Sequence, residues 1–271
     1  MKVAIFFFSA TGNTKAVAEF IAEELKQHEV KVEFHDITSF SSREQEYFLE
    51  GYDGVLFGFP VYAWRAPSPM RTWLANLEGK EARCATFFTY GGISMGAAHH
   101  DTISILKESG FKVLGSLEVI SSHTFNLAGW GILENRPNES DKRLARSFAK
   151  QILIKFEDEG VKELDLGPSE ISEKVLKRLD KTSKKGVPLP KKKTETCSMC
   201  MTCEEVCPTK AMDAEVGIPQ DDQCIRCLCC LVNCPDDVID ILDMAKQKQF
   251  ILKANHLTEL EIKEKKSKML I

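Results

Sequence analysis

The stretch from Cys197 to Pro235 reads CSMCMTCEEVCP, then residues 209–223, then CIRCLCCLVNCP. The spacing C-x2-C-x2-C-x3-C-P therefore occurs twice. This repeat is typical of a segment that holds two 4Fe–4S clusters, in which the fourth cysteine of each run binds the other run's cluster. The pattern predicts Cys197, Cys200, Cys203 and Cys234 as the ligands of one cluster, and Cys224, Cys227, Cys230 and Cys207 as the ligands of the other.

Other uses of these cysteines are less consistent with the pattern. Zinc is held by four ligands, and two zinc sites would not require three cysteines in each tight run followed by Cys-Pro. A disulfide framework is disfavoured because the rest of the chain contains only Cys84, which we expect to be a core thiol. Cys229 lies in the second run but off the ligand spacing, so we expect a small buried residue there.

Length indicates two domains, and the charge is distributed unevenly among segments of the chain. A chain of 271 residues exceeds one ordinary domain, and the cysteine segment is too small to fold without its clusters. The formal net charge of −4 divides into −7 over residues 1–173, +8 over 174–193, −9 over 194–244 and +4 over 245–271. No apolar run is long enough to span a bilayer, and ten unpaired cysteines suit a reducing cytoplasm.

The first half alternates apolar segments with amphipathic ones. We expect strands at Val3–Phe8, Val30–His35, Gly54–Phe59, Ala85–Tyr90 and Lys112–Val119, and helices at Lys15–Gln27, Ser68–Leu77, Ala97–Ser109 and Asp141–Phe156, with a shorter helix near Arg43–Leu49. Five strands that alternate with helices predict a doubly wound α/β domain with a five-stranded parallel sheet.

A short polar loop separates the first strand from the first helix. It consists of Ser9, Ala10, Thr11, Gly12, Asn13 and Thr14. Hydroxyl groups, backbone N–H groups and the positive end of a helix can surround a phosphate there. The loop lacks the G-x-G-x-x-G dinucleotide pattern and the Walker pattern, so a monophosphate ligand fits better. The structural alternative is an ordinary Ser/Thr helix cap.

This loop resembles the flavodoxin phosphate loop S/T-x-T-G-x-T. Together with the doubled cysteine run, it makes the chain similar to the flavodoxin-like/ferredoxin fusion proteins of anaerobic bacteria and archaea. The resemblance implies an FMN-binding flavodoxin-like domain and a small α+β ferredoxin domain with two 4Fe–4S clusters. It covers residues 1 to about 165 and about 195 to 240, and leaves out the tail.

The resemblance implies that two further loops hold the flavin ring. One follows the third strand and contributes Pro60, Val61, Tyr62, Ala63 and Trp64, and the other follows the fourth strand and contributes Thr89, Tyr90, Gly91 and Gly92. The aromatic residues could stack on the ring or belong to the core. Trp64 could cover the ring or turn outward as a gate.

Several segments carry open interpretations. His99 and His100 are expected in a solvated first turn of a helix rather than as proton donors. Residues 121–135 are too long for a plain connection and could form a lid over the flavin or a dock for the ferredoxin part. The tail from Lys246 could pack across the domain seam or mediate a homodimer.

The expected organisation has four parts: a flavodoxin-like domain over 1–165, a helix and basic linker over 166–194, a ferredoxin domain over 195–244 and a C-terminal extension over 245–271. The final helix before the linker is expected at Pro168–Asp180. The linker lysines could serve solubility or dock on the acidic ferredoxin segment. Nucleic acid is disfavoured as a partner, because the flanking segments are acidic.

The function expected from this organisation is cytoplasmic electron transfer between the clusters, FMN and a redox partner protein or small-molecule acceptor. The first alternative is a flavin-dependent reductase of a quinone, a corrinoid or an activated alkene, with Tyr62, Tyr90, His99 and His123 as candidate proton donors. A redox-responsive binding module is a third interpretation. No acid/base pair stands out, so no catalytic residue is predicted and enzymatic activity stays open.

Overall fold

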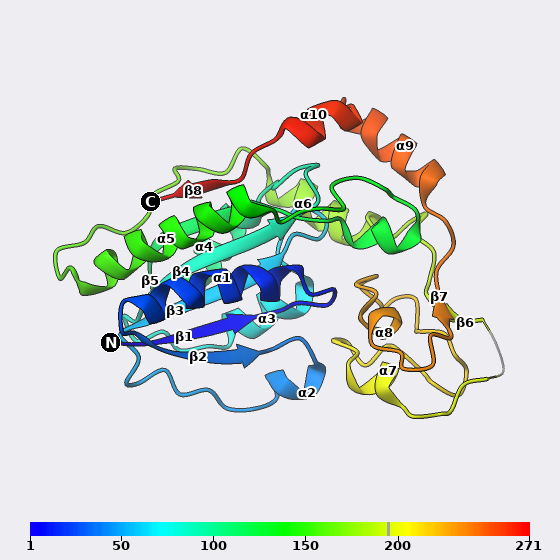
Figure 1. The fold of residues 1–271 in the computed structure, drawn as a ribbon, viewed down its shortest axis with the longest axis horizontal. Helices are drawn as coiled ribbons and strands as arrows, with labels where there is room; N and C mark the ends of the chain where they lie inside the picture. The colour runs from blue at the N-terminus through cyan, green and yellow to red at the C-terminus, as the bar shows by residue number, and fades with distance from the viewer. Residues whose placement is uncertain (194–195) are drawn as a thin grey trace.

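The chain is built around a six-stranded sheet with the order β2-β1-β3-β4-β5-β8 (Figure 1). The computed structural model describes residues 1–193 and 196–271. The first five strands are parallel, and β8 is antiparallel to β5. The strands are β1 (Lys2–Phe7), β2 (Lys31–Asp36), β3 (Gly54–Pro60), β4 (Arg83–Tyr90), β5 (Lys112–Ile120) and β8 (Lys268–Leu270). The predicted parallel α/β sheet is confirmed, and the tail adds an edge strand that the sequence did not reveal.

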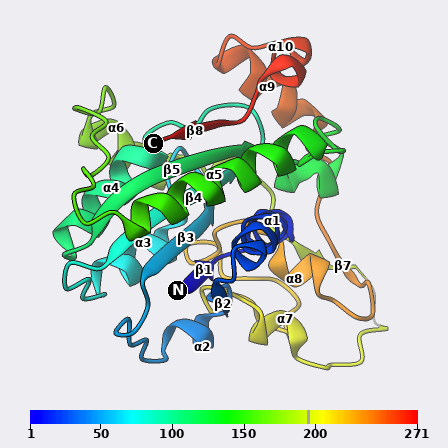
Figure 2. The ribbon, with the colours of Figure 1, turned by 60° about the vertical axis from the view of Figure 1, so that its left-hand side comes forward.

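Helices cover both faces of the sheet (Figure 2). Helices α1 (Asn13–Gln27) and α5 (Glu139–Glu157) pack against each other and against one face. Helices α3 (Ser68–Ala75) and α4 (Ala98–Glu108) pack on the opposite face. The strand order reverses between β1 and β3, and this is where doubly wound folds open a crevice at the carboxyl ends of their strands.

Aromatic side chains fill much of the core beside α3. Phe6 and Phe57 are stacked 5.7 Å apart between ring centroids, and Trp73 lies 5.6 Å from Phe6. Burial of each such side chain contributes about 2–3 kcal/mol. On the other face, Gly58 leaves room for Phe87, whose ring would lie 2.0 Å from an added Cβ. The β strands are therefore held by packing on both faces, as expected for a parallel sheet.

Two helix positions differ from the sequence-based expectation. The prediction of a short helix near Arg43–Leu49 is wrong. Helix α2 instead spans Phe40–Arg43 and is capped by the side chain of Ser39. The helix expected at Asp141 begins earlier, at Glu139, because Asn138 and Asp141 form a capping box. The local caps, rather than the hydrophobic periodicity, set these two starts.

The cysteine segment forms a small unit beyond the carboxyl ends of the parallel strands (Figure 1). Its regular elements are a two-stranded antiparallel sheet and two one-turn helices. They are β6 (Lys191–Lys192), α7 (Thr202–Glu205), α8 (Cys229–Val232) and β7 (Ile239–Asp240). The predicted boundary between positions 194 and 195 lies outside the described residues.

The linker helix and the tail return to the α/β part. Helix α6 (Glu173–Thr182) begins five positions later than expected, and β6 forms within the stretch assigned to the linker. The tail forms α9 (Ala245–Ala254) and α10 (Glu259–Glu264) before it reaches β8. Figure 1 shows this tail running from the cysteine unit back to the far edge of the sheet. The tail therefore spans both parts of the molecule.

Among residues 1–193 and 196–271, no helix combines the length and the apolar character that crossing a bilayer requires.

Candidate cofactor sites

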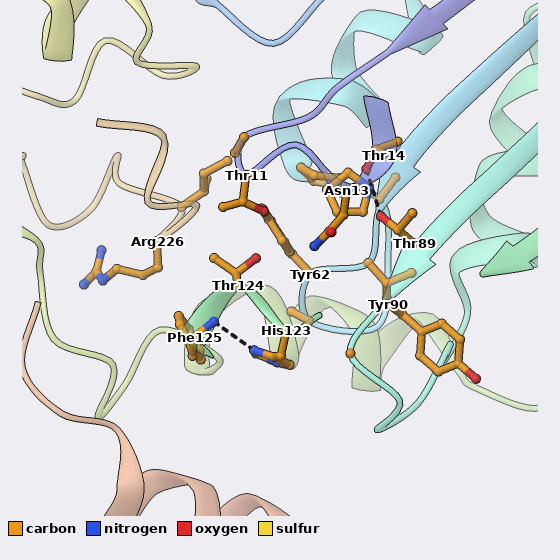
Figure 3. Close-up of a pocket in the computed structure, with 18 of the residues that line it drawn as sticks. Thr11, Asn13, Thr14, Tyr62, Thr89, Tyr90, His123, Thr124, Phe125 and Arg226 are labelled. Atoms are coloured by element: carbon orange, nitrogen blue, oxygen red, sulfur yellow. Dashed lines mark hydrogen bonds between the residues drawn. The ribbon is translucent and has the colours of Figure 1, made fainter. Parts of the chain in front are cut away.

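A cavity of about 320 Å³ opens at the carboxyl ends of the strands, between the α/β part and the cysteine unit. Its size lies within the range of small-molecule sites, about 300–1,000 Å³. Twelve of the fifteen residues predicted to contact FMN line it: Ser9, Ala10, Thr11, Asn13, Thr14, Pro60, Val61, Tyr62, Ala63, Thr89, Tyr90 and Gly91. Three loops that are far apart in sequence thus meet at one opening (Figure 3).

The polar loop is held rigidly at the N-terminus of α1. The backbone N–H of Lys15 donates to Ser9 Oγ at 3.0 Å, and the Thr14 and Thr89 hydroxyls are 2.8 Å apart. Asn13 Nδ2 donates to the carbonyl of Ser122 at 2.9 Å, so the first loop is tied to the 121–135 segment. The free N–H groups of the first helical turn can face an anion here, which fits a phosphate.

Three of the predicted flavin-contacting residues do not line the cavity. Gly12 has φ +90° at the start of α1, so it supplies the turn of the loop rather than a contact. Trp64 has φ +69° and packs against Gly96, where an added Cβ would lie 2.2 Å from the Trp64 Cβ. Gly92 faces Ile262 of α10. Trp64 is therefore packed beside Gly96 at the base of its side chain and is absent from the residues that line this cavity.

The two tyrosines of these loops are placed differently. Tyr62 lies in the cavity wall, which Thr124 also lines. Burial raises the pKa of Tyr62 well above its ordinary value, and the nearby Cys227 adds to that shift. The ring of Tyr90 points away from Thr124 (Figure 3), and its pKa is also raised by burial. Both phenols are therefore neutral at pH 7.

The 121–135 segment serves the cavity and the seam together. His123, Thr124 and Phe125 line the cavity, while Ala128 belongs to an apolar cluster with Leu228 of the cysteine unit. The His123 ring stacks on buried Trp130, with centroids 4.5 Å apart. Burial lowers the pKa of His123 to about 4, and its Nδ1 accepts from the N–H of Phe125 at 3.1 Å. His123 is thus a neutral imidazole whose Nδ1 is already used.

The expectation that His99 lies in a solvated turn is wrong. His99 is 7% exposed, with Nδ1 2.7 Å from Ser116 Oγ and Nε2 3.2 Å from Glu118 Oε2. It does not line the cavity, so it is not positioned as a proton donor there. The α4 periodicity places position 99 toward the sheet, where two polar side chains of β5 satisfy the imidazole.

The eight predicted cluster ligands lie around two hollows, four to each. One, here called the outer hollow, is lined by Cys197, Cys200, Cys203 and Cys234. The other, the inner hollow, is lined by Cys207, Cys224, Cys227 and Cys230. Met212 lines both. Within the described part of the chain, no three His, Cys, Asp or Glu side chains form a group that could hold a single metal ion.

The two cysteine runs share an unusual backbone. Non-glycine residues with positive φ occur in matched pairs along them: Met199 and Arg226 (55° and 58°), Met201 and Leu228 (62° and 61°), and Lys210 and Asp237 (53° and 52°). Such residues are uncommon and strained. Matching strain at equivalent positions shows that each run turns its cysteines inward in the same way, which fits a cube of iron and sulfide inside each hollow.

The inner and outer hollows differ in exposure. All four cysteines of the inner hollow are buried, whereas Cys200 of the outer hollow is exposed. Burial raises the pKa of Cys230 to about 12, so a cluster must displace a proton to bind there. Cys229 is also buried, and Asn233 Nδ2 contacts its sulfur at 3.5 Å. Cys84 is fully buried in the α/β core, as predicted.

The cavity and the inner hollow share a wall. Ile225 lines both spaces, and its neighbour Arg226 also lines the cavity. These two residues were not predicted from the sequence, because only the cysteines of the run follow a recognisable spacing. The sequence did contain an indication, because the first run has Ser198 and Met199 at the positions where the second run has Ile225 and Arg226.

Buried ion pairs attach the linker helix to the α/β part. Arg65, only 4% exposed, donates to Asp101 at 2.8 Å and to Asp180 of α6 at 2.9 Å. Arg71 also donates to Asp180, at 2.9 Å. The linker lysines do reach the cysteine unit, since Lys193 pairs with Asp240 at 3.0 Å, although both side chains are substantially exposed. Helix α6 is thereby fixed beside the cavity.

The tail closes a further side of the site. Ile251 of α9 lines the cavity, and Lys265 Nζ donates to the carbonyl of Ile93 at 2.7 Å. Near β8, Ser267 Oγ donates to Asp141 at 2.5 Å. Both contacts join the tail to the α/β part.

Two family models match the chain. One, described as a flavodoxin domain, covers residues 4–113, and the other, described as a 4Fe–4S binding domain, covers residues 190–213. An uncharacterized protein of Methanocaldococcus jannaschii, MJ0298, is 30% identical over 145 residues, which is 52% of this chain and 90% of that protein.

Two further relatives are flavoproteins by name. A flavodoxin of Clostridium saccharobutylicum is 31% identical over 103 residues, 36% of this chain and 61% of that protein. The putative diflavin flavoprotein A 4 of Nostoc is 27% identical over 114 residues, 42% of this chain and 20% of that protein. Sheet order, cavity, cysteine unit and both matches define an iron–sulfur flavoprotein of the electron-transfer class. The chain belongs to the flavodoxin-like/ferredoxin fusion proteins.

Proposed function

We propose that this protein is an electron relay that holds FMN and two 4Fe–4S clusters in line within one chain. The supporting observation is the sequence of shared walls: Ile225 borders both the cavity and the inner hollow, and Met212 borders both hollows. Electrons can then pass between the outer hollow, the inner hollow and the cavity without crossing bulk solvent.

The residues of the cavity fit FMN. The loop Ser9–Thr14 would hold the phosphate with helix N–H groups and hydroxyls, while the segments 60–63 and 89–91 would flank the ring. When bound, FMN can exchange one or two electrons, whereas each cluster exchanges one. The neutral side chains of Tyr62 and His123 can donate hydrogen bonds in the cavity without adding charge.

The four cysteines around each hollow would supply one thiolate to each iron of a cluster. In this arrangement the outer cluster meets external partners, because Cys200 is exposed there. Residues 196–244 carry ten carboxylates and two cations, so a redox protein with a basic face is the partner we expect. We further propose a reducing, cytoplasmic location, since the site depends on free thiolates.

The test begins with anaerobic purification and counts of iron, sulfide and flavin. We expect eight irons and one FMN per chain. Chemically reduced protein is then offered a panel of protein acceptors, quinones, corrinoids and activated alkenes. Reduction of protein acceptors alone supports the relay, whereas turnover of one small molecule would replace it with the reductase alternative. A zinc-loaded, colourless protein would remove both.

A further inference from the structure

Arg43 joins the α/β part to the inner hollow. It is the last residue of α2, and its Nη1 donates to the carbonyls of residues 37, 38 and 39 at 2.7–2.9 Å. Its Nη2 donates to the carbonyl of Pro208. Pro208 directly follows Cys207, and both residues line the inner hollow. The guanidinium is therefore positioned beside the backbone that carries a predicted cluster ligand.

The charge of Arg43 has no carboxylate partner among the described residues. Its hydrogen-bond acceptors are all carbonyl oxygens, and its ring contact is with Phe40, 5.9 Å away. The side chain is partly buried, and burial lowers its pKa, whereas the nearby Cys207 raises it. Enclosing a guanidinium is costly without a compensating anion. Among the described residues, no carboxylate supplies that anion.

The other cations near the inner hollow are already compensated. Arg226 pairs with Asp221, and Lys210 lies 3.7 Å from Glu44. The outer hollow is lined by one charge of each sign, Lys192 and Asp236. Arg43 is thus distinguished from these cations by its lack of an acidic partner.

A loaded inner hollow would supply the anion. Four thiolates outweigh the positive charge of the iron–sulfide core, so the bound cluster is negative in both redox states. One added electron increases that negative charge by one, and no proton needs to move at Arg43. A fixed cation nearby favours the more negative state, and it does so strongly where solvent is excluded.

We propose that Arg43 is the counter-cation of the cluster bound by Cys207, Cys224, Cys227 and Cys230, and that it raises the reduction potential of that cluster. The inference rests on the proposed function, because it assumes that this cluster is present. Since Arg43 belongs to the α/β part, the cluster has its raised potential only while the two parts are docked. The flavin-binding part then tunes the cluster that faces it.

The test is a redox titration of both clusters by EPR in the wild type and in Arg43→Gln and Arg43→Lys. We expect Arg43→Gln to lower the reduction potential of one cluster by 59 mV or more. For a one-electron couple, 59 mV corresponds to a tenfold change in the equilibrium constant. Arg43→Lys keeps the charge and should keep most of the potential. Arg83→Gln is the matched control, because Arg83 also donates to a carbonyl, that of Phe156, at the opposite end of the strands.

The variant Asp236→Asn identifies which of the two clusters has the changed reduction potential. Asp236 accepts from the N–H and the hydroxyl of Ser198 beside the outer hollow, so its neutralisation should raise the other potential. Unchanged potentials in a fully loaded Arg43→Gln protein, or an equal fall in Arg43→Lys, would overturn the proposal.

Arg43→Met is a second neutral variant in case Arg43→Gln does not assemble. If both neutral variants lose the inner cluster while Arg43→Lys retains it, the positive charge is required, as proposed. If the lysine variant loses it too, Arg43 is a structural clamp and the proposal is wrong. Iron and flavin counts on the same wild-type sample separate the two hypotheses: a wild type without two clusters contradicts the relay, whereas loaded variants with unmoved potentials contradict only the role of Arg43.

Discussion

The ammonium group of Lys265 donates a hydrogen bond to the carbonyl oxygen of Ile93 at 2.7 Å, across 172 positions of sequence. Ile93 follows the loop that lines the cavity at Gly91, and Gly92 between them faces Ile262 of the same tail. The tail therefore supports a loop that we propose to flank the flavin ring.

Replacement of Lys265 by Met should weaken FMN binding about fivefold, since one hydrogen bond of this kind contributes about 1 kcal/mol. Fluorescence titration of the deflavinated protein measures the dissociation constant. Lys266→Met is the control, because Lys266 is exposed and next in sequence. An equal loss in both variants would mean that general tail charge, rather than the Ile93 contact, matters.

Gly12→Ala should reduce FMN affinity and stability together. Gly12 has φ +90°, and an added Cβ meets no atom within 4 Å, so the cost is backbone strain of about 1 kcal/mol. Gly51→Ala is a close control, with φ +88° and equally open surroundings away from the cavity. Both variants should lose similar thermal stability, and only Gly12→Ala should bind FMN more weakly. Equal FMN affinities would argue against the phosphate loop.

His123 should make stability sensitive to acid. Its pKa of about 4 in the folded protein lies below the ordinary 6.5, so the unfolded chain binds a proton first as pH falls. This contribution to stability is complete above pH 6.5 and is lost between pH 6.5 and about 4, by up to about 1.4 kcal/mol per pH unit.

The measurement is urea unfolding of the α/β part by circular dichroism at pH 7 and pH 5. The wild type should lose more stability between these pH values than His123→Gln. His256→Gln is the control, since His256 is exposed. A pH dependence in His123→Gln that matches the wild type would show that other groups cause it.

Cys200→Ser and Cys229→Ala should separate cluster ligands from neighbouring cysteines. Cys200 lines the outer hollow, whereas Cys229 lines neither hollow although it is only 3% exposed. We expect fewer than eight irons in the first variant and eight in the second, by metal analysis with EPR. Loss of iron in Cys229→Ala, with Cys200→Ser unaffected, would contradict the ligand assignment.

The parts of the fold that were predictable from sequence are those governed by local periodicity. The five parallel strands follow from apolar runs, and the polar loop follows from its position between a strand and a helix. Cysteine spacing also predicted how eight residues divide between two hollows. In each case the informative residues are close in sequence or repeat at fixed intervals.

Tertiary packing decided the remainder. Trp64 follows the third strand, as the predicted flavin loop requires, and the base of its side chain packs beside Gly96, 32 positions later in the chain. The polar sequence around His99 suggests a surface turn, but both ring nitrogens of His99 have buried partners on β5, Ser116 and Glu118. Ile225 borders two sites only because the cysteine unit docks at the strand ends. Partners this distant leave no periodic signal in a single sequence.

Strand β8 has a consequence for how the protein is made. Glu118 of β5 pairs with Lys268, so the edge of β5 receives its partner only after the cluster-binding segment has been synthesised. Until then, a nascent chain on the ribosome presents an open strand edge, which is prone to association with other chains. The cysteine unit precedes the tail in the chain, so it emerges from the ribosome before the strand that covers this edge.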